Sequence, residues 1–174
     1  KNATFLDLCG GWAVEPLKLT DKGFENLLSI SNELENLDRL ELCECGPDIT
    51  DKSASYIAEL PYLKYLSIMK CSDITDQGLE YLASSHSIES IFLARCNITN
   101  EGFKYFGKNP FLKGMRLESF SQRQINNSGL EYILAIPNIE SLSFGSMPFL
   151  DDQSMQLFAE SDKLKKLAFP SDCL

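Results

Sequence analysis

Histidine is nearly absent from this chain, which contains His86 and no other. This argues against histidine-rich metal sites and against catalysis by a histidine pair. Basic residues are also scarce, because 16 lysines and arginines stand against 25 acidic residues and the net charge is −9. Such a balance argues against a protein that follows nucleic-acid phosphates. No apolar run reaches the roughly 18 to 20 residues that cross a bilayer, so we expect neither nucleic acid nor membrane as a partner.

The chain of 174 residues repeats the pattern L-x-x-L-x-L-x-x-C, or a variant of it, every 24 to 27 residues. The copies start at Leu37, Leu63, Ile88, Leu112, Ile139 and Leu164, with a weaker first copy at Ala3. The longer first interval predicts an irregular insertion at about residues 11–18. Alternation such as Leu40-x-Leu42 is typical of a short strand with one buried face.

A second motif, I-T-D-x-G-L or a variant, lies between the predicted strands. Its copies occupy residues 19–24, 49–54, 74–79, 98–103, 125–130 and 150–155. The Thr-Asp or Asn-Asn pair suits a helix N-cap, and apolar residues follow at helical spacing. Each unit is therefore predicted to be a strand, a turn and a helix, stacked in parallel on the next.

These paired motifs resemble the cysteine-containing class of leucine-rich repeats, which is common in F-box substrate receptors. The resemblance implies an α/β leucine-rich repeat solenoid of about seven repeats, with a curved parallel sheet on the concave face and helices on the convex face. We expect one domain over residues 1–174 and a fragment of a larger protein. Neither end shows a polar cap, so end-to-end self-association is a further expectation.

Five of the six cysteines fall at two repeat positions, and Cys173 lies in the tail. Cys45, Cys71 and Cys96 share one of them, which predicts an interior column of free thiols. Cys9 and Cys43 share another, and a disulfide between them stays open because it needs specific geometry. Interior thiols favour a reducing, cytoplasmic location. The competing interpretation, an extracellular receptor ectodomain, predicts disulfides and glycans instead.

Side chains between the buried leucines are predicted to point out of the concave face. In the middle repeats these columns contain residue types that are enriched at binding hot spots. The candidate partner-binding residues are Arg39, Tyr65, Met69, Phe92, Arg95 and Arg116. The three arginines would be available for acidic groups of a partner. The alternative is that scattered exposed apolar side chains are ordinary.

We therefore expect a non-enzymatic interaction scaffold that binds a protein or peptide on the concave face. The alternative is the substrate-recognition domain of an F-box type ubiquitin-ligase receptor or of another multidomain protein. We predict no catalytic residue, no cofactor and no metal, because phosphate loops, CxxC pairs and nucleophile elbows are missing. The one carboxylate pair that could be proposed for catalysis, Asp7 with Glu41, is better explained by surface acidity.

Overall fold

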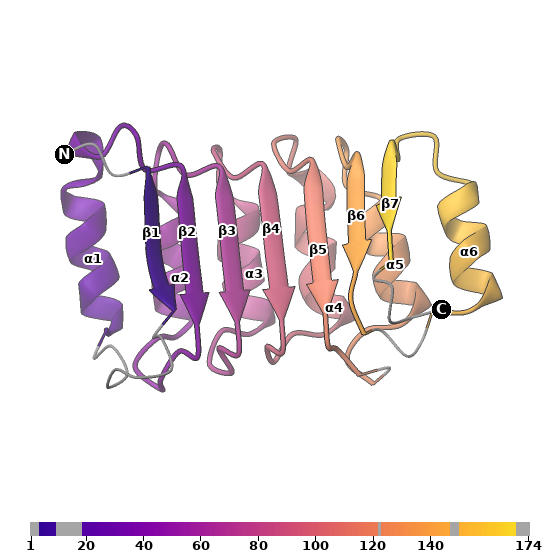
Figure 1. Cartoon of the computed structure of the whole chain (residues 1–174), viewed down its shortest axis with the longest axis horizontal. Helices are drawn as coiled ribbons and strands as arrows, with labels where there is room; N and C mark the ends of the chain where they lie inside the picture. Colours follow the sequence, from indigo (N-terminus) through magenta and orange to yellow (C-terminus); the bar gives the residue numbers. More distant parts are fainter. Residues whose placement is uncertain (1–3, 10–18, 122, 147–149, 170–174) are drawn as a thin grey trace.

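The structure is a computed structural model, and it describes residues 4–9, 19–121, 123–146 and 150–169. Seven strands form one parallel sheet in the order of the sequence (Figure 1). They are β1 (Phe5–Cys9), β2 (Arg39–Cys43), β3 (Tyr65–Met69), β4 (Ser90–Ala94), β5 (Gly114–Glu118), β6 (Ser141–Phe144) and β7 (Lys166–Ala168). The predicted insertion at about residues 11–18 lies outside the described residues.

Each connection between strands contains a helix. The α-helices are α1 (Asp21–Ser29), α2 (Asp51–Ala58), α3 (Asp76–Ala83), α4 (Asn100–Phe103), α5 (Asn127–Leu134) and α6 (Asp152–Ala159). Two short 3₁₀ helices follow α1 and α4, namely η1 (Ser31–Glu33) and η2 (Lys104–Lys108). One strand and one helix per repeat is the predicted unit.

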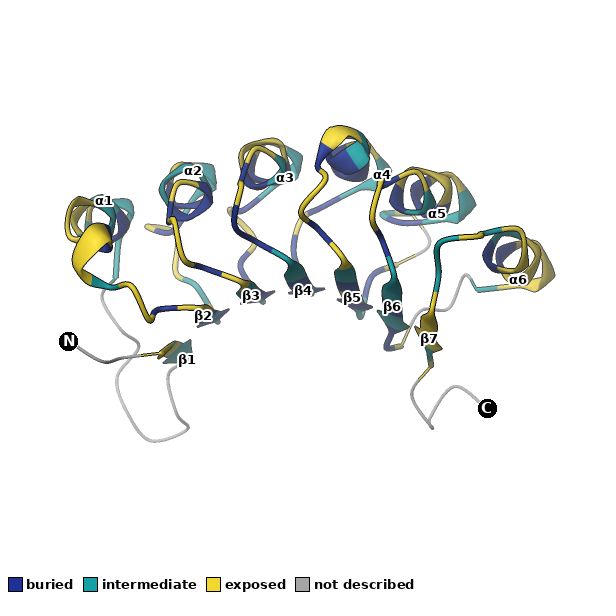
Figure 2. Cartoon of the chain, turned by 90° about the horizontal axis from the view of Figure 1, so that it is seen from above, coloured by how far each residue is buried: buried dark blue, intermediate teal, exposed yellow. Residues whose placement is uncertain are grey.

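The sheet is curved, and the helices lie along its convex side (Figure 2). Neighbouring strands are about 4.8 Å apart, whereas packed helices need about 8 to 10 Å. Because both layers advance by one element per repeat, the helix layer must follow the longer arc. This confirms the predicted curvature, and no described helix covers the concave face.

The core lies between the two layers and is built from the repeat leucines. The register pairs Leu40 with Leu66 and Leu66 with Ile91, and each of these side chains is at most 1% exposed. Burying one such side chain contributes about 2 kcal/mol, and the column stays buried from β2 to β6. The predicted stack of neighbouring repeats is therefore what holds the molecule together.

The residue after each strand turns the chain. Glu44, Lys70, Arg95 and Ser119 have φ between 53° and 60°, in the left-handed region. The turn sends the next side chain back under the sheet, which is why Cys71, Cys96 and Phe120 are buried. The left-handed turn therefore explains why the sequence places an exposed polar residue such as Lys70 after the strand and a buried cysteine such as Cys71 directly after it.

Acidic and amide side chains link each helix start to the next one. The Asp51 carboxylate accepts hydrogen bonds from the Thr75 N–H and Oγ1 at 2.7 and 2.8 Å, and Asp76 does the same with Thr99. Asn100 replaces the acid one repeat later and bonds to Asn126. We call this row of contacts the cap ladder. It fixes the spacing of the helix N-termini.

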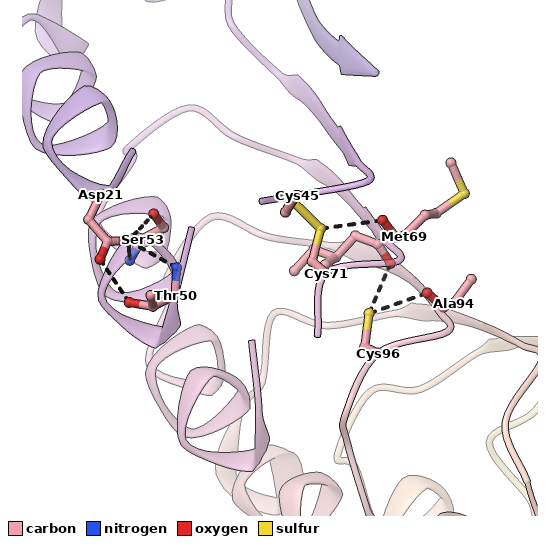
Figure 3. Close-up of a disulfide and its surroundings, with 9 residues drawn as sticks. Asp21, Cys45, Thr50, Ser53, Met69, Cys71, Ala94 and Cys96 are labelled. Carbon is pink, nitrogen blue, oxygen red and sulfur yellow. Dashed lines mark hydrogen bonds between the residues drawn. A yellow bond between two sulfur atoms is a disulfide. The ribbon is translucent and has the colours of Figure 1, made fainter. Parts of the chain in front are cut away.

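Two cysteines form a disulfide that the sequence analysis did not predict. Cys45 and Cys71 are bridged, with Cα atoms 4.7 Å apart (Figure 3). The expectation of free thiols at these two positions is therefore wrong, because equivalent positions of adjacent repeats lie within bridging distance. Cys96 remains a thiol, and burial raises its pKa. Cys9 and Cys43 are both free.

Candidate protein-binding face

The predicted outward columns are confirmed as rows that cross the concave face. Parallel pairing places Arg39 beside Tyr65, Phe92 beside Arg116 and Cys43 beside Met69. The six candidate residues therefore lie on or next to four adjacent strands, β2 to β5. Arg39, Arg95 and Arg116 are exposed, and the other three side chains are partly buried.

Arg39 lies between two aromatic rings. Its guanidinium carbon is 4.0 Å from the centroid of the Tyr65 ring and 5.4 Å from that of Phe5. Its Nε also donates a hydrogen bond of 2.9 Å to Glu41. The hydrogen bond to Glu41 raises the pKa of Arg39, and burial raises that of the Tyr65 hydroxyl, so both keep their protons at neutral pH.

A second arginine repeats this arrangement three strands further on, on β5. The guanidinium carbon of Arg116 is 4.6 Å from the centroid of the Phe92 ring, and its Nη2 donates a hydrogen bond of 2.8 Å to Glu118. We call Phe5–Arg39–Tyr65 and Phe92–Arg116 the arginine–aromatic stacks. In both, an arginine is held between a ring and a carboxylate before any partner is present.

Arg95 differs from the other two arginines. It occupies the left-handed turn after β4, and within the described part of the chain its guanidinium has no ion-pair partner. Lys70, one repeat earlier in the same column, is paired with Glu44. The three arginines are thus not equivalent: two are already neutralised by glutamates, and Arg95 is the one that is open to an acidic group.

Beyond the stacks, the concave face carries small residues in place of large side chains. Gly114, Ser141, Ser143 and Gly145 present little side chain on β5 and β6. A Cβ on Gly145 would come within 2.6 Å of Glu118 Cγ, so Glu118 covers the space that a larger residue would need. The stacks therefore border a flat zone of small residues.

The convex side carries its own aromatic column, on the helices. It consists of Tyr56, Tyr81, Tyr105 and Tyr132. Tyr81 and Tyr132 are 40% and 36% exposed, and no arginine contacts any of these rings within the described residues. Lysines approach two of them at 5.5 to 5.8 Å. The tyrosine column can therefore serve as the control surface in experiments that test binding on the concave face.

One group of side chains at the edge of the concave face was not predicted as a unit. It joins two carboxylates and two thiols from β1 and β2, and we call it the acid–thiol cluster. Its members are Asp7, Cys9, Glu41 and Cys43. Burial, followed by the nearby Asp7 and Cys43, raises the pKa of the Cys9 thiol to about 12. The sequence analysis named the Asp7–Glu41 and Cys9–Cys43 pairs separately, and the pairing of β1 with β2 brings the two pairs together.

His86 lies in the loop between α3 and β4, away from the strands of the concave face. It is exposed, and its ring centroid is 5.5 Å from that of Phe111. The neighbouring Ser87 is buried and donates its hydroxyl hydrogen bond to the carbonyl of Leu60 at 2.8 Å. The Ser87 hydroxyl is therefore held by the backbone of the preceding repeat.

Comparison with known families adds one finding. The family model described as "Leucine Rich repeat" matches residues 59–83. That segment contains β3 and α3, which is one strand–helix unit of the repeat. The fold is an α/β leucine-rich repeat solenoid. In the described residues, no helix combines the length and the apolarity needed to cross a bilayer.

Proposed function

We propose that this leucine-rich repeat chain binds a protein or peptide on its concave face, across β2 to β5. Leucine-rich repeat domains generally mediate protein–protein interaction, and they are typically non-enzymatic scaffolds. The observation that carries the proposal is the pair of arginine–aromatic stacks. Packing between repeats does not require them, because they lie on the side of the sheet away from the core.

The stacks are suited to binding because their order is established in the free protein. A long arginine side chain normally loses rotamer freedom when a partner immobilises it, at a cost of about 0.5 to 1.5 kcal/mol. The contacts of Arg39 with Tyr65 and of Arg116 with Phe92 reduce that loss. Aromatic rings and arginines are also the residue types that dominate binding energy at interfaces.

The charges define the partner more closely. Glu41 and Glu118 compensate the two stacked arginines, so the middle of the face offers apolar rings with balanced charge. Arg95 directly follows Ala94, which pairs with Met69, and it adds one positive charge that has no ion-pair partner among the described residues. We therefore propose a partner segment that places an apolar side chain over these rings and an acidic group at Arg95.

A crosslinking experiment followed by a titration tests the face. A photoreactive phenylalanine analogue at position 92 should capture the partner, and the same analogue at position 81 on the convex side should not. In calorimetric titrations of the captured partner, Tyr65→Ala combined with Phe92→Ala should weaken binding at least tenfold, a loss of about 1.4 kcal/mol or more.

The matched control is Tyr56→Ala combined with Tyr81→Ala, which removes two rings from the convex column. This variant should keep the wild-type affinity. The reverse result, in which the convex variant abolishes binding and the concave variant leaves affinity unchanged, would show that the partner uses the other side. Thermal unfolding of both variants separates a binding defect from a folding defect.

The F-box alternative rests on the cysteine column and the I-T-D-x-G motif, which resemble repeats of F-box receptors. Under this proposal the chain is the substrate-recognition domain of a ubiquitin-ligase receptor in the cytoplasm. The full coding sequence would test it by showing whether a helical adaptor segment is present.

The cytoplasmic location is tested by counting the free thiols of this protein in alkylated cell extracts. The count should be six if all cysteines are reduced, and two fewer if the Cys45–Cys71 disulfide persists.

A further inference from the structure

The acid–thiol cluster occupies the β1 end of the concave face and shares Glu41 with the Phe5–Arg39–Tyr65 stack. The register pairs Asp7 with Glu41 and Cys9 with Cys43 on adjacent strands. Residues two apart on a strand point to the same face, so all four side chains leave the sheet together. The cluster thus has the layout of a four-cornered site in which carboxylates form one edge and thiols the other.

The ligand atoms are already close. A carboxylate oxygen of Asp7, the Cys9 Sγ and a carboxylate oxygen of Glu41 all lie within 4.8 Å of one another. Tetrahedral zinc, with bonds of about 2.0 to 2.3 Å, places its ligands about 3.3 to 3.8 Å apart. Small side-chain rotations cover this difference, and Cys43 contacts Cys9 from the neighbouring strand.

Hydrogen bonds hold both carboxylates and leave one oxygen of each uncommitted. The Cys9 N–H donates to Asp7 Oδ1 at 2.8 Å, and the nitrogens of Arg39 donate to Glu41 Oε1. Asp7 Oδ2 and Glu41 Oε2 receive no such bond in the described residues. Oriented ligands with a supporting shell are what metal sites in proteins show.

We propose that the acid–thiol cluster binds one divalent cation of the zinc class. The donor set decides the class, because thiolates favour zinc over magnesium and calcium, which take oxygen ligands. A cation would also compensate four side chains that are anionic when deprotonated. The sequence analysis predicted no metal because the chain contains no CxxC pair, whereas the four ligands proposed here come from two neighbouring strands.

Titration of the full chain with zinc ions alone tests the proposal. Calorimetry under nitrogen, without added thiol so that the Cys45–Cys71 disulfide is kept, should give one zinc ion per chain. Cobalt(II) in place of zinc should give the intense absorption of a tetrahedral thiolate complex. Zinc added afterwards should bleach that absorption, because both ions would occupy the same site.

The variants separate the cluster from general surface acidity. Cys9→Ser and Asp7→Asn should each weaken zinc binding at least tenfold, and Cys9→Ser should remove the cobalt–thiolate band. Glu131→Gln, which removes an exposed carboxylate from α5 on the convex side, should leave both signals unchanged. Absence of the thiolate band in the wild type, or equal loss in Glu131→Gln, would overturn the proposal, and so would a thiol count showing Cys9 and Cys43 oxidised together.

Discussion

Gly102 lies where the preceding repeat leaves no room for a side chain. A Cβ at this position would come within 2.6 Å of Asp76 Oδ1, and one at Gly78 would come equally close to Asp51 Oδ1. No glycine of the described chain has a positive φ, so backbone conformation does not explain this choice. The glycine of the I-T-D-x-G motif is instead explained by contact with the cap ladder.

Gly102→Ala should destabilise the protein although alanine favours helices. Overpacking against a carboxylate that is held by two hydrogen bonds should cost about 1 to 3 kcal/mol, which exceeds the gain in helix propensity of about 1 kcal/mol. Guanidinium unfolding would show a lower midpoint with an unchanged slope. Gly107→Ala, at a position where a Cβ would meet nothing within 4 Å, is the control and should lose no stability.

Serine at the same position should be tolerated better than alanine. Ser53 occupies the equivalent place in α2, and its hydroxyl donates a hydrogen bond to Asp21 Oδ1 instead of clashing with it. Gly102→Ser should therefore recover part of the loss of Gly102→Ala through a bond to Asp76. A serine variant less stable than the alanine variant would show that steric contact alone decides this position.

At the scale of elements, Asp21 joins α1 to α2. Its carboxylate accepts hydrogen bonds from the N–H and the hydroxyl of Thr50, at 3.0 and 2.8 Å, and from both groups of Ser53 (Figure 3). Partial burial raises the pKa of Asp21, but the bonds from Ser53 and Thr50 outweigh it and the pKa is lowered. The charged form is thus the one that holds the two helices together.

Asp21→Ala should lower the free energy of unfolding by about 2 to 3 kcal/mol, because several donors lose a charged acceptor. Because the pKa is lower in the folded state, the wild type keeps this contribution above about pH 4 and loses it as the pH falls further. The variant should lose less stability on acidification. Urea unfolding at several pH values measures both effects.

Asp152→Ala is the matched control for this experiment. Asp152 opens α6 as Asp21 opens α1, but within the described residues it accepts no hydrogen bond from another repeat. Its removal should change stability by less than about 0.5 kcal/mol. Equal losses at both positions would mean that a helix-end charge, and not the cap ladder, provides the stabilisation.

The secondary-structure elements and the register of the strands were predictable because both follow from the sequence repeat. Alternation at Leu40-x-Leu42 marks a strand, and the equal spacing of copies aligns that strand with its neighbours. The same spacing placed Tyr65 and Phe92 on the concave face. What periodicity does not report is which side chains of different repeats bond to one another, so the Cys45–Cys71 disulfide was missed and the two pairs of the acid–thiol cluster were not joined into one group.

Helix details also depart from the repeat pattern. Thr50, Thr75 and Thr99 cap their helices as predicted, whereas Thr20 makes no capping hydrogen bond through its side chain. α4 ends after four residues and continues as η2. The nine residues of α4 and η2 together contain two glycines, Gly102 and Gly107, which weakens the α-helical form there.

At the scale of the whole molecule, the two outer strands lack one neighbour. β1 and β7 each pair on one side only within the described sheet. As a result Leu167 is 37% exposed, whereas Leu142, its partner on β6, is fully buried. Phe169 and Phe5 are 37% and 44% exposed at the same two ends. Unpaired strand edges with apolar side chains favour pairing with another chain.

We predict that the 174-residue chain associates end to end, β7 of one copy beside β1 of the next. Such a head-to-tail contact does not close on itself, so sedimentation should show a mass that rises with concentration without stopping at a dimer. Because every copy has a net charge of −9, added salt should strengthen the association by screening repulsion. Leu167→Lys should abolish it, whereas Tyr81→Lys, at a similarly exposed position on the convex side, should not. A monomer at every concentration in high salt, or equal loss in both variants, would show that the exposed ends do not pair.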